Sequence, residues 1–270
     1  MTEYDAGANR VDTSTAHSAR VYDYFLGGKT NYPVDEELAE TILAVDPTVR
    51  NTALVNRWFM HRATRWLSQN GVRQYIDIGT GIPTEPNLHR IAQEAAPASN
   101  IVYVDNDPIV IRHAEALLDS APEGATDYIQ ADVRNPGRII EAAGRIIDFG
   151  KPVALSVIAL LHFVSDEDDA YGIVRRLVDA LAPGSYLVLA HVTGDFDPEN
   201  AEKVVALYRK RSGTTLRPRT REEVARFFQG MELVAPGLEL APQWHPELSR
   251  DESAAGDTPV PVYVGVARKV

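Results

Sequence analysis

Short apolar runs alternate with amphipathic segments along the chain from residue 74 onwards. The apolar runs have the length and composition of buried strands, and the segments between them carry apolar residues at helical spacing. Strands that alternate with helices predict an α/β fold, with a mostly parallel sheet covered by helices on both faces. The strands are expected at 74–78, 101–105, 127–130, 152–158 and 186–190, and the helices between them at 87–95, 108–118, 138–143 and 167–181.

Further segments precede and follow this pattern. Asp35 and Asp46-Pro47 mark the starts of two helices in front of the first strand. A long insert and two closing strands follow the fifth strand. The expected organisation is a poorly ordered tail at 1–17, a helical extension at 18–70, and an α/β core at 71–270 that contains an insert at 193–219 and closing strands at 231–235 and 261–267.

The composition restricts the kinds of function that the chain can carry. The sequence has 270 residues and no cysteine, which rules out disulfides, thiolate metal ligands and a cysteine nucleophile. No apolar run approaches the roughly 18 residues of a membrane span, and the first twenty residues are unlike a signal peptide. We therefore expect a cytoplasmic protein with no membrane partner and no metal site.

The charge of the chain argues against general nucleic-acid binding, because the formal net charge is −11. The tract at 209–226 is a local exception, with seven arginines and lysines against Glu222 and Glu223. Such a tract can be a solvated helix end and loop or a site for a polyanion. The first interpretation is favoured.

The loop after the first strand has the sequence Asp77-Ile78-Gly79-Thr80-Gly81. Glycines at Gly79 and Gly81 permit positive φ angles and let a ligand approach the backbone closely. Asp77 can accept hydrogen bonds from a cationic or hydroxyl-bearing ligand. In open α/β sheets, ligands bind at the carboxyl ends of the strands, where this loop would lie.

Polar side chains recur at the ends of the next strands. Asp105, followed by Asn106, ends the second strand and can bridge the two hydroxyls of a ribose. Asp132 follows the third strand and can accept from an exocyclic amino group such as that of adenine, while Val133 can pack on the ring. Together these residues predict a site for a nucleoside-containing ligand.

Each of these residues also has a purely structural interpretation. Asp77 could cap the next turn, Asp105 could cap the helix opened by Pro108, and Asp132 could be an ordinary turn residue. His162, near the end of the fourth strand, could be a structural histidine. The recurrence of such residues at four strand ends in sequence order favours the binding interpretation.

These residues resemble a known family. Asp77-x-Gly79-x-Gly81, Asp105 and Ala131-Asp132-Val133 resemble the first three motifs of class I S-adenosylmethionine-dependent methyltransferases. The resemblance implies a Rossmann-like sheet of seven strands whose last strand is antiparallel. A closer resemblance, to a bacterial family of such enzymes catalogued as a domain of unknown function, is carried by Ala19-Arg20-Val21-Tyr22-Asp23-Tyr24-Phe25-Leu26-Gly27-Gly28-Lys29 and by Gln243-Trp244-His245-Pro246.

The resemblance implies a role for each matching position. Gly79, Gly81 and Asp77 would lie near the methionine part of the cofactor, Asp105 near the ribose, and Asp132 and Val133 near adenine. Ser156 and His162 would flank the sulfonium. The N-terminal helix would form a lid in which Arg20 pairs with the methionine carboxylate and Tyr22 lines the cavity.

The function that follows is methyl transfer from S-adenosylmethionine to a small-molecule acceptor. His162, His191 and Tyr24 are the candidates for a general base, if a base is used at all. Two alternatives stay open: a cofactor-binding module without catalysis, and an NAD-dependent oxidoreductase, against which Asp77 and Thr84 count. A nucleic-acid methyltransferase is a weaker fourth possibility and rests on the basic tract at 209–226.

Overall fold

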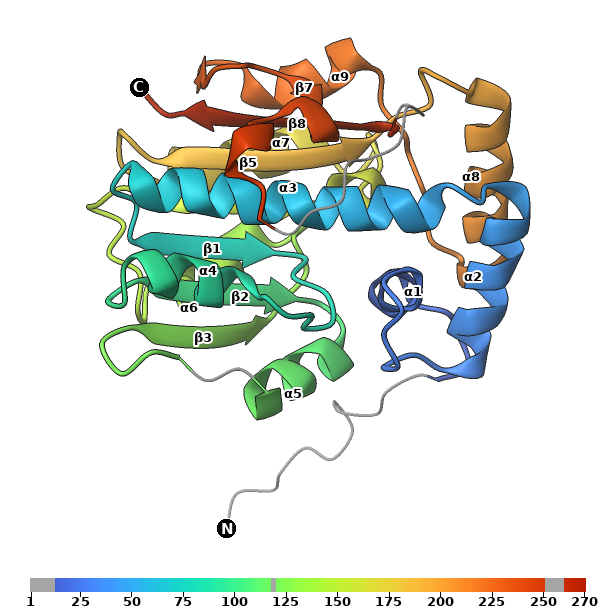
Figure 1. Ribbon diagram of the computed structural model, residues 1–270, viewed down its shortest axis with the longest axis horizontal. Coiled ribbons are helices and arrows are strands. Elements are labelled where there is room, and N and C mark those ends of the chain that lie inside the picture. The colour runs from blue at the N-terminus through green and yellow to red at the C-terminus, as the bar shows by residue number, and fades with distance from the viewer. Residues whose placement is uncertain (1–12, 118–119, 251–259) are drawn as a thin grey trace.

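The protein folds around one eight-stranded sheet with helices on both faces (Figure 1). The computed structural model describes residues 13–117, 120–250 and 260–270. The strands are β1 (Gln74–Ile78), β2 (Asn100–Asp105), β3 (Ala125–Gln130), β4 (Ala154–Ile158), β5 (Tyr186–Val192), β6 (Glu232–Leu233), β7 (Glu239–Leu240) and β8 (Val262–Arg268). Their order in the sheet is β3-β2-β1-β4-β5-β8-β6, and β7 also pairs with β8.

The helices account for most of the remaining described chain. The α-helices are α1 (Ser18–Phe25), α2 (Pro33–Val45), α3 (Val49–Gln69), α4 (Leu88–Ala95), α5 (Pro108–Leu117), α6 (Pro136–Ala143), α7 (Ala170–Asp179), α8 (Pro198–Ser212) and α9 (Arg221–Ala225). Short 3-10 helices are η1 (Leu161–Phe163), η2 (Arg226–Phe228), η3 (Ala241–Gln243) and η4 (Pro246–Leu248). No helix in the described ranges is long and apolar enough to cross a membrane.

The strands β1 to β5 pair in parallel, so their carboxyl ends share one edge of the sheet. The strand β8 runs antiparallel between β5 and the short strands β6 and β7. In Figure 1 the helices α1, α2 and α8 stand beyond the arrowheads of the parallel strands. The predicted mostly parallel α/β fold is therefore confirmed, and helices lie beyond the carboxyl edge of its parallel strands.

Alternating residues of the strands pack into two separate hydrophobic cores, one on each face of the sheet. On one face, Tyr75 and Tyr103 pack with α3 and α4. On the other face, Ile76 and Val102 pack with α6 and α7. Successive strand side chains point to opposite faces, so strands with a buried residue at nearly every position are expected in a sheet covered on both sides. This burial fixes the register and with it the positions of the loops at the strand ends.

A third, smaller core lies away from the sheet. It joins α1, α2, α3 and α8 through Phe25, Leu38, Ile42, Ala53 and Tyr208. The helix α3 belongs to two cores, because its later part packs on the sheet through Phe59 and Leu67. The N-terminal helices are thereby anchored to the sheet and to α8.

The closing strands differ from the sequence-based expectation. The segment at 231–235 forms a strand only at Glu232–Leu233, and β7, which was not predicted, brings the sheet to eight strands rather than seven. Gly230 and Gly237 have positive φ angles of 80° and 102°, which bend the chain on both sides of β6. Pro236 has no N–H to donate to a neighbouring strand.

The predicted tail at 1–17 lies largely outside the described residues. Within the described part, Ala16 belongs to the small helical core and His17 caps α1. The backbone N–H of His17 also donates to Asp35 Oδ1 at 2.9 Å. Residues 16 and 17 therefore already pack against the rest of the fold.

Candidate cofactor and acceptor site

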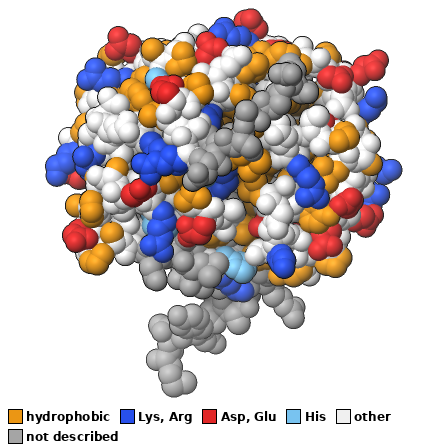
Figure 2. Space-filling view, viewed as in Figure 1, with side chains coloured by type: hydrophobic (Ala, Val, Ile, Leu, Met, Phe, Trp, Pro, Cys, Tyr) orange, Lys and Arg blue, Asp and Glu red, His pale blue; other side chains and the backbone are white. Residues whose placement is uncertain are grey.

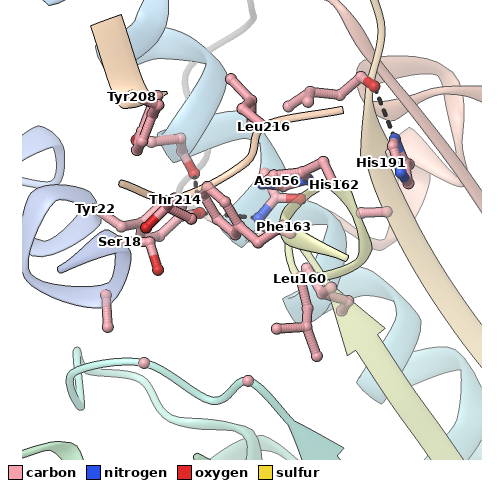
Figure 3. Close-up of a pocket in the computed structure, with 18 of the residues that line it drawn as sticks. Ser18, Tyr22, Asn56, Leu160, His162, Phe163, His191, Tyr208, Thr214 and Leu216 are labelled. Carbon is pink, nitrogen blue, oxygen red and sulfur yellow. Dashed lines mark hydrogen bonds between the residues drawn. The ribbon is translucent and has the colours of Figure 1, made fainter. Parts of the chain in front are cut away.

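One large pocket lies between the carboxyl edge of the sheet and the helices beyond it, with a volume of about 860 Å³. We call its lining residues at 77–81, 105–106 and 131–134 the strand-end wall. We call its lining residues from α1, α2, α3, η1, α8 and the segment 213–216 the helical wall. Figure 3 shows ten labelled residues of the pocket, most of them from the helical wall.

The glycines of the first loop are required by its geometry. Gly79 has a φ of 73°, its N–H donates to Val104 O at 2.8 Å, and a Cβ on it would lie 2.8 Å from the side chain of Leu160. Gly81 has a φ of 67°, and a Cβ on it would meet no atom within 4 Å. Gly79 thus permits close packing of the loop, whereas Gly81 leaves open space on the pocket side.

Asp105 is held in one orientation by backbone donors. Its Oδ2 accepts from the N–H of Gly81 at 2.9 Å, and its Oδ1 accepts from the N–H of Asp107 at 2.9 Å. Burial raises the pKa of Asp105 above its ordinary value, an effect that these hydrogen bonds oppose. The carboxylate is therefore part of the glycine loop as well as of the pocket wall.

Asp77 lies deeper in the strand-end wall. Burial raises its pKa, and the nearby positive charge of Arg57 counteracts this. Arg57 projects from α3, lines the pocket and donates through Nη2 to Pro86 O at 3.2 Å and to Thr84 O. Ser156 pairs in register with Asp77 but does not line the pocket, so the expectation that it flanks the sulfonium is not supported.

The remaining strand-end residues lie where the sequence placed them. Asn106, Asp132 and Val133 all line the pocket. Asn106 is exposed and Val133 is buried. Asp132 accepts from the N–H of Arg134 at 2.8 Å and forms an ion pair with its guanidinium. This part of the wall can take the flat face and the edge of a base.

The N-terminal signature divides into pocket and support residues. Tyr22 lines the pocket; its hydroxyl donates to Ala53 O at 2.8 Å and accepts from Asn56 Nδ2 at 2.8 Å (Figure 3). Arg20 does not line the pocket. Its guanidinium forms buried ion pairs with Asp35 and Asp107, at 3.3 Å each, so it is not placed to bind a ligand carboxylate as expected.

The rest of the signature closes a turn around Asp23. The Oδ2 atom of Asp23 accepts from the N–H of Thr30 and from Asn31 Nδ2, both at 2.9 Å. A Cβ on Gly28 would lie 2.0 Å from Asp23 Oδ1. Gly28 is therefore required by packing, and this part of the signature shapes the chain between α1 and α2.

The two candidate histidines differ in their surroundings. His191 Nδ1 donates to Val192 O at 2.8 Å, and Nε2 accepts from Arg219 Nη1 at 2.9 Å, so neither nitrogen is available as a base. Burial lowers the pKa of His191 to about 3. His162 is buried and lines the pocket, and its Nδ1 has no hydrogen-bond partner among the described residues.

Burial, together with the neighbouring His191 and Arg219, holds the pKa of His162 well below its ordinary value. Arg219 fixes the turn that carries His162. Its guanidinium donates to Leu161 O at 2.8 Å and to Val164 O at 3.0 Å, on either side of His162. It also forms an ion pair with Asp166 at 2.7 Å. His162 is therefore a neutral, rigidly held member of the helical wall.

Comparison with known proteins decides the family. A family model described as S-adenosyl methyltransferase matches residues 5–270. The chain belongs to this S-adenosyl methyltransferase family. A comparison with curated protein sequences gives no match.

Two solved structures resemble this family member over nearly its whole length. A DUF574 family protein from Streptomyces avermitilis is 46% identical, with a TM-score of 0.92, and the match covers 97% of this chain and 100% of that one. A candidate methyltransferase from Thermobifida fusca is 36% identical, with a TM-score of 0.85, and the match covers 96% of both chains.

A more distant structure shares the fold alone. The plantazolicin methyltransferase BpumL, solved with a triazolic desmethylPZN analog and SAH, is 11% identical with a TM-score of 0.54, and the match covers 93% of this chain and 96% of that one. The fold is thus the Rossmann-like methyltransferase fold, and the cofactor of the family is S-adenosylmethionine.

The strand-end wall of this methyltransferase family member fits a nucleoside cofactor. The open space beside Gly81 is next to the fixed carboxylate of Asp105, and a Cβ there would fill part of it. Asp105 offers acceptors for ribose hydroxyls, and Asp132 with Val133 offers an acceptor and an apolar surface for a base. The residues present therefore match the donors and flat surface of the cofactor.

The third candidate base is outside the site. Tyr24 does not line the pocket. Its hydroxyl donates to Glu40 Oε1, and the guanidinium of Arg50 lies 5.1 Å from the centre of its ring. Tyr24 thus belongs to the outer contacts between α1, α2 and α3, because Tyr22 and not Tyr24 lies on the pocket face of α1.

The basic tract at 209–226 is divided among internal contacts. Arg211 pairs with Glu37, Arg217 with Asp166 and Glu223, and Arg226 lies 4.1 Å from the ring centre of Tyr171. On the face that Figure 2 shows, acidic and basic side chains are interspersed. These contacts support the structural interpretation of the tract over a polyanion site.

Most of the helical wall carries no signal in the sequence. The missed lining residues with buried or aromatic side chains include Asn56, Met60, Phe163, Tyr208 and Leu216. The apolar ones fall at ordinary core positions of helices, and no motif marks them. The one usable signal was the polar pair Asn56 and Arg57 within an otherwise apolar stretch of α3.

Proposed function

We propose that this protein transfers the methyl group of S-adenosylmethionine to a small organic molecule bound against the helical wall. One observation carries the proposal: a single pocket joins the polar strand-end wall to a largely apolar helical wall. Its volume of about 860 Å³ is in the upper part of the range of about 300–1,000 Å³ that single small-molecule sites occupy. It has room for a cofactor and a small acceptor together.

The cofactor supplies an already activated methyl group, so the protein mainly has to position the acceptor and exclude water. Asp105 would bind the ribose, and Asp132 with Val133 the adenine. Arg57, rather than Arg20, would bind the carboxylate of the methionine part. Its guanidinium is anchored beside the glycine loop, and its buried Nε has no hydrogen-bond partner among the described residues.

None of the three candidate bases is suited to act as a strong base in the pocket. His191 is engaged at both ring nitrogens, Tyr24 lies outside, and the pKa of His162 is well below its ordinary value. Positioning by the walls is thus the main contribution that the residues support. An acceptor that loses a proton would release it to solvent.

The test is cofactor binding followed by turnover. Calorimetric titration with S-adenosylhomocysteine should give one site per chain, and Arg57→Met should weaken it about ten-fold or more through loss of charge-assisted hydrogen bonds. Incubation with radiolabelled S-adenosylmethionine and bacterial small-molecule extracts should then label an organic product. Unchanged cofactor affinity in Arg57→Met would contradict the carboxylate assignment.

A binding module without catalysis is the alternative that the same experiments separate. Tight binding of S-adenosylhomocysteine with no labelled product from any extract would favour the module. No binding of S-adenosylhomocysteine would refute the proposed function itself.

A further inference from the structure

The buried side chains that the helical wall presents to the pocket are uncharged, and its charged member, Arg57, is only partly buried. Its buried members are Phe25, Ile42, Ala53, Asn56, Met60, His162, Tyr208 and Leu216. Phe163 adds an aromatic surface, with its ring centre 5.6 Å from that of Tyr208 and 4.4 Å from that of His162. A charged ligand placed against these buried side chains would lose its hydration without gaining an ionic partner among them.

Asn56 and Tyr22 of the helical wall are held by hydrogen bonds to one another and to the backbone. Asn56 Nδ2 donates to the Tyr22 hydroxyl, which donates to Ala53 O. Asn56 Oδ1 is buried and has no hydrogen-bond partner among the described residues, so the wall keeps an unpaired acceptor there. This chain of hydrogen bonds, which Figure 3 shows, fixes the amide and the phenol. His162 is the second buried polar side chain of the wall with an unpaired group, and it can turn a ring nitrogen to a ligand.

The geometry of His162 indicates which of its ring nitrogens faces a ligand and whether that nitrogen carries the proton. Nδ1 is buried and has no hydrogen-bond partner among the described residues, so Nε2 is the nitrogen available to a ligand. A neutral imidazole carries one proton. A proton on Nδ1 would be a buried donor without an acceptor, which is rarer and costlier than an unpaired acceptor. The proton therefore belongs on Nε2, and His162 offers a donor.

We propose that the methyl acceptor is an uncharged, largely apolar molecule with an oxygen that accepts a hydrogen bond from His162 Nε2. This inference rests on the proposed methyl transfer and specifies the substrate class of the same site. His162 is then a positioning and specificity residue. The contacts of Arg219 on either side of it, at Leu161 O and Val164 O, hold the turn that carries it.

Matched aromatic probes test the proposal on the full-length protein saturated with S-adenosylhomocysteine. The first pair is 2-acetylnaphthalene and 2-ethylnaphthalene, which differ by a carbonyl oxygen. The acetyl compound should bind about five-fold more tightly, as expected for one neutral hydrogen bond. The second pair is methyl 2-naphthoate and 2-naphthoate, and the ionised compound should bind at least about ten-fold more weakly.

Variants of His162 connect the preference to the residue. His162→Phe should abolish the preference for 2-acetylnaphthalene, and His162→Gln, which keeps an N–H donor, should restore part of it. His245→Gln is the control, because His245 does not line the pocket, and it should leave both preferences unchanged. The affinity for S-adenosylhomocysteine, measured in each variant, reports whether the fold is intact.

Three results would overturn the proposal. The first is tighter binding of 2-naphthoate than of its ester. The second is a preference for 2-acetylnaphthalene that persists in a His162→Phe protein with normal cofactor affinity. The third is normal binding of S-adenosylhomocysteine with no binding of any probe. Failure to bind S-adenosylhomocysteine at all would instead refute the proposed function, so the two failures are distinguishable.

Discussion

The two walls of the pocket are built in different ways. The strand-end wall is held by contacts between residues close in sequence or on adjacent strands, such as the Gly81 N–H with Asp105 and the Asp107 N–H with Asp105. The helical wall is assembled from segments far apart, as in the buried pair of Arg219 and His191 and the packing of α1 and α3 against α8. The strand-end wall therefore depends on the ends of neighbouring strands, and the helical wall depends on the packing of helices that are distant in the sequence.

This difference predicts that the two walls can be damaged separately. A substitution in the support of the helical wall should lower stability and acceptor binding while the cofactor still binds. A substitution in the strand-end wall should weaken cofactor binding and leave stability largely unchanged. The following predictions test this separation, from the largest expected effect to the smallest.

Arg219→Met should have the largest effect. It removes the donors to Leu161 O, Val164 O and His191 Nε2, and buried acceptors left unpaired cost about 3 kcal/mol or more in total. Urea unfolding measures the loss. The control Arg175→Met changes an exposed residue of α7 and should shift stability by less than about 0.5 kcal/mol. Loss of cofactor affinity equal to the loss of acceptor binding would contradict the separation of the walls.

His191→Gln should reduce the pH dependence of stability. The pKa of His191 is about 3 in the folded protein and near 6.5 when unfolded, so between these values the unfolded state binds more protons. Stability therefore rises with pH in this window and falls as the solution is acidified. The wild-type protein should lose about 2–3 kcal/mol more than His191→Gln between pH 7 and pH 4. Urea unfolding at both pH values checks this, and equal losses would refute it.

Asp105→Ala should weaken binding of S-adenosylhomocysteine by about 1–3 kcal/mol, because it removes the proposed acceptor for the ribose hydroxyls. Calorimetry measures the change. Asp127→Ala is the control: Asp127 pairs with Arg145 outside the pocket. An unchanged cofactor affinity in Asp105→Ala would exclude the ribose assignment.

Tyr24→Phe should have the smallest effect. Its hydroxyl contacts Glu40 on the outer side of α1, and such surface substitutions shift stability by less than about 0.5 kcal/mol. Methyl transfer, once an acceptor is known, should keep its rate within about two-fold. A large fall in turnover with unchanged stability would return Tyr24 to the list of candidate bases.

The same difference explains what the sequence could reveal. Gly79, Gly81, Asp105 and Asp132 were predicted to be at the ligand edge because each follows a recognisable strand, and parallel strands end at one edge. Arg20 was assigned to the pocket because the sequence cannot show that Asp35 and Asp107 take its guanidinium. These partners lie on α2 and after β2, and only the packing of the helices brings them together.

The helical wall was hidden for a similar reason. Tyr208 and Leu216 are ordinary apolar positions in the sequence, and they line the pocket only because α8 packs beside α1 and α2. The strand at 231–235 was overestimated because alternating apolar residues do not reveal the bends at Gly230 and Gly237. Residues at strand ends could be predicted from the sequence, whereas contacts between segments far apart in the sequence could not.

Asp107 connects the helical wall of the pocket to the strand-end wall. Its N–H orients Asp105, and its carboxylate lies 3.3 Å from Arg20 Nε and from His17 Nδ1, at the start of α1. Moving α1 aside would break these contacts. The position of α1 and the orientation of the Asp105 carboxylate are therefore linked through a single side chain, so the two walls share one anchor at Asp107.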